Sequence, residues 1–244
     1  MITLSSTGWL LMVLAALIVG LSKTALPGST ALAVGLAASA LPAKESTGTL
    51  LVLLMVGDLM AIRAYRHDAD WPTLRSMAPP VVAGLLVGAV YMRVADDLAM
   101  RRVIGVILLL MAALNVWQRA SRRPMAPAGG WASVGYGGLA GFTTMTANAA
   151  GPVTSLYFLS RGFDVRRFLG TSAWFYLCVN ITKLPLAIGA GVVNPQTLVI
   201  DLVLVPVVLL AAVLGRRLAS RISRKVFDPL VLLFTVVAAL NLLW

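Results

Sequence analysis

The segment VGLSKTALPGSTALAVGL, residues 19–36, interrupts an apolar run with hydroxyl groups, a lysine and a Pro-Gly pair. A second interruption, GFTTMTANAAGPVTSLYF at residues 141–158, follows the middle of the chain. The apolar elements that contain them, 9–41 and 131–160, are too long for one membrane crossing and too short for two. We expect each element to be a re-entrant pair of half-helices, with one kinked helix or two short helices joined at the surface as the alternatives.

The composition makes lipid the solvent for much of the chain. Of its 244 residues, 59% are hydrophobic and 12% are charged, and the mean hydropathy is +0.91. One soluble core could not bury so much apolar surface. Several runs approach the ~20 residues that a helix needs to cross a bilayer, and they lack the alternation of barrel strands. We therefore predict an all-α polytopic membrane protein.

A polar segment divides the chain near its middle. Residues 118–130, QRASRRPMAPAGG, combine charge with prolines and glycines, which is typical of a linker. This segment separates a first membrane repeat, 1–117, from a second, 131–244. The distribution of positive charge places the linker in the cytoplasm.

Short matches between the two parts indicate a duplicated unit. The pair Gly-Thr at 48–49 recurs at 170–171, a shift of 122 residues. The same shift places Asp58 on Asn180. We predict two inverted repeats, each a broken or re-entrant helical hairpin plus three transmembrane helices.

The positive charges test this topology. With re-entrant hairpins, fourteen lie on one side of the membrane: Arg63, Arg66, Arg75, Arg119, Arg122, Arg123, Arg161, Arg166, Arg167, Arg216, Arg217, Arg221, Arg224 and Lys225. Four lie on the other: Lys44, Arg93, Arg101 and Arg102. If each broken element crossed once, the division would be twelve against six. The positive-inside rule favours the first division, in which both termini are periplasmic.

The excess of basic residues does not indicate a nucleic-acid partner. The chain has twenty Lys and Arg against nine Asp and Glu. Nearly all of these basic residues lie in short segments between apolar runs, as in the cytoplasmic loops of membrane proteins. No Lys or Arg precedes Lys23, so the basic region of a cleavable signal peptide is missing, and we expect the first apolar stretch to remain in the mature protein.

Polar residues gather at the two interruptions, where we expect an anion to bind. Where half-helices begin, free backbone N–H groups and the positive dipole end favour anions, and Lys23 adds a full charge. Alternatively, Lys23 ends a single span and reaches to the interface, and the hydroxyl groups cap or pack helices. The candidate substrate-binding residues are Ser22, Lys23, Thr24, Gly28, Ser29, Thr144, Thr146, Asn148 and Gly151.

Three further residues are candidates for coupling or gating. Asn180 and Lys183 are one turn apart in the apolar stretch 168–188, and Asp58 occupies the position equivalent to Asn180. Asp58 and Asn180 each lie about ten residues inside a helix, roughly 15 Å from its end and near the bilayer midplane. Asp58 either pairs with a lysine or takes and releases a proton; a structural ion pair or an interfacial position is the alternative.

Residues for catalysis or cofactor binding are scarce. His67, the only histidine, lies in the loop sequence RAYRHDAD, and Cys178 is the only cysteine. Such an inventory offers no intramembrane Ser/His dyad, metal cluster or internal disulfide, and no Walker-type GK[ST] loop is present. We therefore expect neither an enzyme nor a bound metal or cofactor.

The motifs together resemble a known transporter family. The early VGLSKTALPGSTALAVGL and the later GGLAGFTTMTANAAGPVTSLYFLSRGFDVRRFLGTSAWF are similar to the sulfite exporter TauE/SafE family of bacterial membrane transporters, over essentially the whole chain. At the first break the sequence departs from the glycine-rich family pattern, with Ser22-Lys23-Thr24 before Pro27-Gly28. The resemblance implies export of a small sulfur-containing anion, sulfite or an organosulfonate, across the bacterial inner membrane.

The sequence thus supports a secondary transporter that binds an oxyanion near Lys23 and Asn148 and works by alternating access. A passive anion channel is the alternative, since it would share the basic pathway. A membrane enzyme would need a catalytic group that the sequence does not offer. The oligomeric state stays open, a homo-oligomer included.

Overall fold

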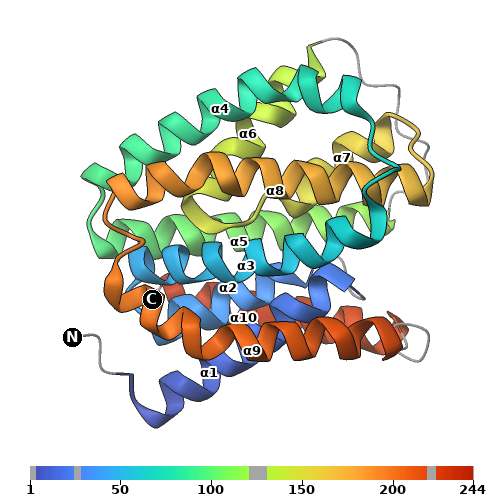
Figure 1. Ribbon diagram of the computed structural model, residues 1–244. Helices are drawn as coiled ribbons and strands as arrows, with labels where there is room; N and C mark the ends of the chain where they lie inside the picture. The colour runs from blue at the N-terminus through green and yellow to red at the C-terminus, as the bar shows by residue number, and fades with distance from the viewer. Residues whose placement is uncertain (1–3, 25–28, 121–130, 219–223, 244) are drawn as a thin grey trace.

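The computed structural model describes residues 4–24, 29–120, 131–218 and 224–243, and these fold into ten α-helices (Figure 1). The first half contains α1 (Ser6–Thr24), α2 (Thr30–Ala40), α3 (Ala43–Tyr65), α4 (Trp71–Val94) and α5 (Asp97–Ala120). The second contains α6 (Ala132–Ala147), α7 (Gly151–Ser160), α8 (Val165–Gly189), α9 (Pro195–Leu218) and α10 (Arg224–Leu243). The all-α prediction is confirmed for the described residues.

In the part of the chain that the structure describes, four helices are long and apolar enough to cross a membrane. The qualifying segments are Ser6–Lys23, Ala43–Arg63, Trp71–Val94 and Pro195–Gly215. The last has the highest mean hydropathy, 2.8 over its window. Many large apolar side chains of these helices face outward, as expected where lipid is the solvent.

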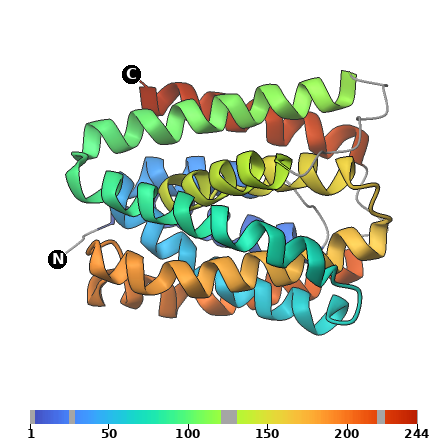
Figure 2. The same ribbon diagram turned by 90° about the horizontal axis from the view of Figure 1, so that it is seen from above.

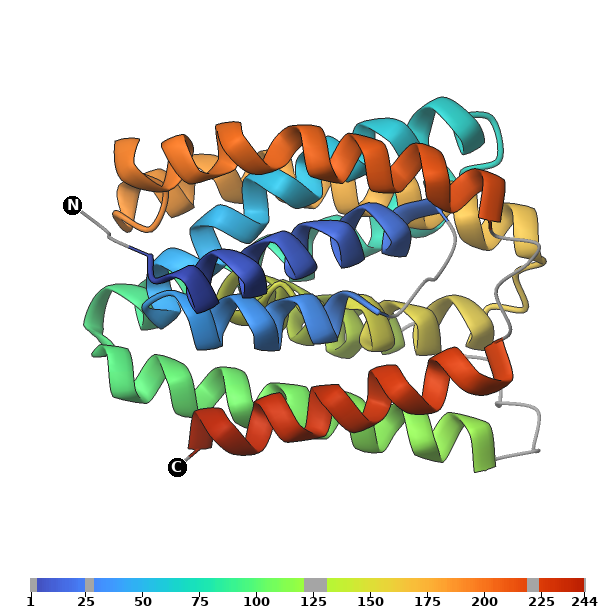
Figure 3. The ribbon, with the colours of Figure 1, turned by 90° about the horizontal axis from the view of Figure 1, so that it is seen from below.

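Each half begins with a long helix followed by a short one, and the chain reverses direction between them. Figure 3 shows α2 returning alongside α1, and the two helices pack together. α6 and α7 form the second such hairpin. The helices of each hairpin are separated at the Pro/Gly interruptions of the sequence. In the second hairpin, Pro152 lies in the first turn of α7, where a proline is tolerated, whereas it would disrupt the interior of a helix that continued from α6.

Each hairpin packs mainly against helices of the other half. α1 packs against α9 and α6 against α4, while α2 packs against α10 and α7 against α5. The helices that follow the hairpins, α3 and α8, pack against each other in the centre. α3 and α8 run in opposite directions, as do α4 and α9 (Figures 1 and 2).

Glycines allow the hairpins to approach their partner helices closely. A Cβ on Gly84 of α4 would overlap the carbonyl oxygen of Gly138, and one on Gly141 of α6 would overlap that of Val81. Gly20 of α1 lies in the same way against α9. Small residues at helix contacts are typical of membrane proteins, where backbones pack closely to gain van der Waals contact.

Candidate functional site

Asn148 lies at the tip of the second hairpin, between α6 and α7. Its backbone is left-handed, with φ of 50°, a conformation that asparagine tolerates better than most residues. Its side-chain Nδ2 donates to the carbonyl oxygen of Thr47 in α3 at 3.0 Å. The Thr47 hydroxyl in turn donates to the carbonyl oxygen of Thr146 at 3.2 Å. The hairpin tip is therefore held against α3.

Lys183 of α8 reaches the same tip. It is fully buried, and its Nζ donates to the carbonyl oxygen of Thr144 at 2.5 Å and to Oδ1 of Asn148. Both acceptors are uncharged. Among the described residues, no carboxylate forms an ion pair with Lys183.

Lys23 of α1 has a carboxylate partner instead. Its Nζ lies 2.5 Å from Oδ1 of Asp58 in α3. Asn180 of α8 donates from Nδ2 to Oδ2 of the same carboxylate at 2.7 Å. Asp58 is fully buried. The Lys23 ammonium balances its charge, and the Asn180 amide donates a hydrogen bond to it.

Tyr176 of α8 contacts both Lys23 of the first hairpin and Thr154 of the second. The Nζ of Lys23 lies 4.5 Å from the centre of its ring, a favourable cation–π distance. Its hydroxyl lies 2.7 Å from Oγ1 of Thr154 in α7. Tyr176, Asn180 and Lys183 follow one another at helical spacing, so one face of α8 presents all three.

With both lysines protonated, the cluster formed by Lys23, Asp58, Asn148 and Lys183 has one positive charge that no described carboxylate balances. It contains two ammonium groups, Lys23 and Lys183, against the single carboxylate of Asp58. An ammonium buried without an opposite charge costs several kcal/mol, even where neutral acceptors satisfy its donors. A small anion at the tip of the second hairpin would balance this charge.

The predicted hydroxyl residues are buried, but several bond their own helices. Ser22 donates to the carbonyl oxygen of Val19 at 2.8 Å, and Thr146 to that of Phe142 at 2.9 Å. Ser29 is buried at the start of α2. Thr144 is buried too, and it meets Lys183 through its carbonyl rather than its hydroxyl group.

Two of the predicted substrate-binding residues lie partly or wholly outside the part of the chain that the structure describes. Gly28 and the side chain of Thr24 lie outside the described residues. Gly151 begins α7, and a Cβ added to it would lie 3.8 Å from the Tyr176 hydroxyl.

Tyr176 and Thr47 are not among the site residues predicted from the sequence. Tyr176 precedes Asn180 by one helical turn, so its spacing could have indicated it. Thr47 contacts Asn148 through a backbone carbonyl, which any residue type would supply. No pattern of side chains could have indicated that contact.

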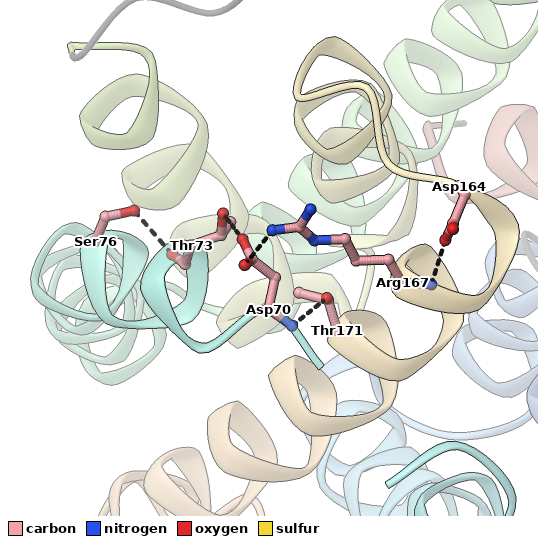
Figure 4. A network of polar contacts seen from close by, with 6 residues as sticks. All are labelled: Asp70, Thr73, Ser76, Asp164, Arg167 and Thr171. Atoms are coloured by element: carbon pink, nitrogen blue, oxygen red, sulfur yellow. Dashed lines mark hydrogen bonds and ion pairs between the residues drawn. The ribbon is translucent and has the colours of Figure 1, made fainter. Parts of the chain in front are cut away.

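A second polar cluster joins the two halves where α4 and α8 begin (Figure 4). Asp70 Oδ1 lies 2.6 Å from Nη2 of Arg167, and the Asp70 backbone N–H donates to the Thr171 hydroxyl at 2.9 Å. The Thr73 hydroxyl donates to Oδ2 of Asp70. Burial raises the pKa of Asp70, but the hydrogen bonds from Thr73 and Arg167 outweigh it and lower that pKa below its ordinary value of 3.8.

Comparison with known proteins identifies one family. A family model described as sulfite exporter TauE/SafE matches residues 12–242, nearly the whole chain. The search of curated proteins and the search of solved structures each gave no match.

Proposed function

Because the chain belongs to the sulfite exporter TauE/SafE family, we propose that it is a secondary transporter that moves sulfite or an organosulfonate out across the bacterial inner membrane. The family consists of membrane transporters rather than enzymes. The four apolar helices agree with a position in the membrane. The substrate, the direction and the transport cycle are the parts of this proposal that experiment must test.

The observation that carries the proposal is the unbalanced ammonium of Lys183. Its two partners, the Thr144 carbonyl and the Asn148 side chain, are neutral. A sulfite or sulfonate group has several oxygens that accept hydrogen bonds from ammonium and backbone N–H groups. We place the anion beside Lys183 and Asn148, near the start of α7, whose dipole also favours negative charge.

This location divides the predicted site residues into two groups. Asn148, Gly151 and Thr144 belong to the hairpin tip that would surround the anion, and Lys183 joins them. Lys23 and Asp58 neutralise each other. In the proposed site they keep α1 and α3 together and contribute little net charge to binding.

The contacts between helices support two inverted halves. If α1 to α5 correspond in order to α6 to α10, the packing of α1 on α9 corresponds to that of α6 on α4. The packing of α2 on α10 likewise corresponds to that of α7 on α5. Rocking of one half against the other would then expose the site alternately to each side.

Charge supports the orientation of these halves. Arg66, Arg75, Arg161 and Arg167 lie where α3, α4, α7 and α8 begin or end at one end of the bundle. The start of α1 and the end of α10 lie at the other end (Figure 3). By the positive-inside rule the arginine-rich end is cytoplasmic, which would make both termini periplasmic.

Counterflow in proteoliposomes tests the transporter proposal. Vesicles loaded with unlabelled sulfite and diluted into a trace of labelled sulfite should accumulate label transiently, because a carrier exchanges one bound anion for another. The rate should saturate as the sulfite concentration rises. A passive channel would show flux without transient accumulation and without saturation, and that result would overturn the proposal.

A further inference from the structure

Asp201 of α9 is a buried carboxylic acid without a partner. The residue is 2% exposed, and neither carboxylate oxygen has a hydrogen-bond partner in the described part of the chain. The other buried aspartates, Asp58 and Asp70, each form an ion pair. Asp201 therefore needs a different explanation from either of them.

No described charge near α9 neutralises this group. α9 packs mainly against α1 and α3, whose charged residues are Lys23, Lys44, Glu45, Asp58 and Arg63. None of these forms an ion pair with Asp201, and Lys23 is occupied by Asp58. On α9 itself, the basic residues Arg216 and Arg217 lie fifteen and sixteen positions further along, at least roughly 22 Å away along the helix axis.

Such surroundings favour binding of a proton. An ionised carboxylate that is buried without a partner costs several kcal/mol, whereas the neutral acid avoids most of that cost. A sodium ion would need several oxygen ligands besides this carboxylate, such as backbone carbonyl groups. A proton needs only the carboxylate.

The position of Asp201 connects its protonation to movement of the hairpin. α9 is the helix against which α1 packs, and a Cβ on Gly20 of α1 would overlap the carbonyl oxygen of Val208. In the proposed rocking of one half against the other, α1 belongs to the first half and α9 to the second, so the motion would shift α1 relative to α9. Such a shift can expose Asp201 to water, where the proton leaves and the charged form becomes stable.

We infer that Asp201 is the proton-carrying residue of this transporter. It takes a proton from water on one side of the membrane, crosses the transport cycle as the neutral acid and releases the proton to water on the other side. The inference rests on the proposed transport function. It replaces Asp58 in the coupling role, since both oxygens of Asp58 are held by Lys23 and Asn180.

Substitution Asp201→Asn tests this inference, because asparagine resembles the neutral acid and cannot release a proton. Counterflow of labelled sulfite should stay within about twofold of wild type, since exchange needs no net proton movement. Net sulfite flux driven by an imposed pH gradient should fall at least tenfold. The sulfite–bisulfite equilibrium responds to pH equally in both preparations, so their difference reports on Asp201.

Two further measurements complete the test. Asp201→Glu keeps a carboxyl group and should restore most of the gradient-driven flux. In wild-type vesicles that contain a trapped pH dye, sulfite flux should move protons in excess of those that Asp201→Asn vesicles move. Equal proton movement in the two, or an Asp201→Asn protein with wild-type gradient response, would overturn the inference. Absence of counterflow in wild type would instead refute the transport function itself.

Discussion

The two lysines of the site differ in what neutralises them. Lys23 faces the carboxylate of Asp58, whereas Lys183 faces a carbonyl group and the amide of Asn148. A charged group that is buried beside neutral acceptors retains most of its field, because the local dielectric constant is low. In the proposed site, Lys183 is therefore the residue that would attract an anion most directly.

Replacing Lys183 should weaken anion binding strongly. Lys183→Met keeps the length and most of the volume of the side chain but removes the charge. Hydrogen bonds to charged groups contribute about 1.5–3 kcal/mol, which corresponds to roughly ten- to hundredfold in affinity. Sulfite binding to the purified protein, measured by calorimetry, should weaken by that factor.

Lys44→Met provides the matched control for this experiment. Lys44 lies in the first turn of α3. The Lys44→Met protein, which carries the same chemical change, should bind sulfite with wild-type affinity. Equal affinities for the two variants would contradict the assignment of Lys183 to the site.

Removing one partner of the Lys23–Asp58 pair should cost more than removing both. Asp58→Asn leaves the Lys23 ammonium without a counter-charge, and breaking a buried pair in this way typically costs about 3–5 kcal/mol. The double variant Lys23→Met/Asp58→Asn removes both charges. Unfolding in detergent should show the double variant to be more stable than Asp58→Asn. A double variant that was less stable than Asp58→Asn would show that Lys23 and Asp58 do not neutralise each other.

The pairing of Asp58 with a particular lysine was only partly predictable from the sequence. The sequence indicated that Asp58 lies near the bilayer midplane and offered pairing with a lysine as one possibility. It could not decide which lysine, because Lys23 precedes Asp58 by 35 positions and reaches it only through the packing of α1 on α3. The role of Lys183 at the tip of the second hairpin depends likewise on tertiary structure.

At the scale of the helices, the sequence predicted the positions of the breaks within the two hairpins, but it did not predict several helix ends. The pairs Pro27-Gly28 and Gly151-Pro152 predicted where each hairpin turns. The apolar run in this part of the sequence begins at Val103, but α5 begins at Asp97. Asp97 accepts a hydrogen bond from the Ala43 backbone at 2.7 Å, so a charged turn extends this helix beyond its apolar part.

Because α6 of the second hairpin packs closely against α4, replacing two of its glycines with alanine should have different effects on stability. Gly141→Ala would push a methyl group into the α4 backbone, whereas a Cβ on Gly135 meets nothing within 4 Å. Overpacking typically costs about 1–3 kcal/mol, and alanine gains up to about 1 kcal/mol over glycine in a helix. Thermal unfolding in detergent should show Gly141→Ala destabilised and Gly135→Ala unchanged or more stable. Equal effects would mean that α4 and α6 do not approach this closely.

At the scale of the whole molecule, the Asp70 cluster joins the first half to the second. The pKa of Asp70 is lowered in the folded protein, so its charged form contributes stability above the ordinary value of 3.8. This contribution is lost as the pH falls through the lower pKa of the folded state. Arg167 is 55% exposed at its side chain, which limits the ion pair to about 1 kcal/mol.

Substitution Asp70→Asn should therefore lower stability at pH 7 but not in acid. Denaturant unfolding between pH 3 and pH 7 should show the difference from wild type shrinking below pH 3.8, where Asp70 of the unfolded chain binds a proton while folded Asp70 still resists protonation. Asp68→Asn, in the same connection, is the control, since Asp68 forms no ion pair among the described contacts. A stability difference for Asp70→Asn that did not change with pH would contradict this explanation.

The prediction of two halves and the prediction of their orientation rest on different signals in the sequence. The Gly-Thr match at 48–49 and 170–171 and the charge asymmetry of the loops predicted a duplicated and inverted molecule. Neither signal reports distances between halves. Contacts such as Asp70 with Arg167, 97 positions apart, follow from how α4 and α8 pack and could not be predicted.

The most direct test of this account is the accessibility of the second hairpin tip. Ala149, 4% exposed, can be replaced by cysteine after the native thiol is removed with Cys178→Ser. We predict that Cys at 149 reacts slowly with a small anionic thiol reagent, that sulfite protects it, and that the reagent reaches it from either side of the membrane in turn. Rapid labelling from one side only, without protection by sulfite, would show that the tip is an ordinary surface turn and would contradict a site inside the membrane.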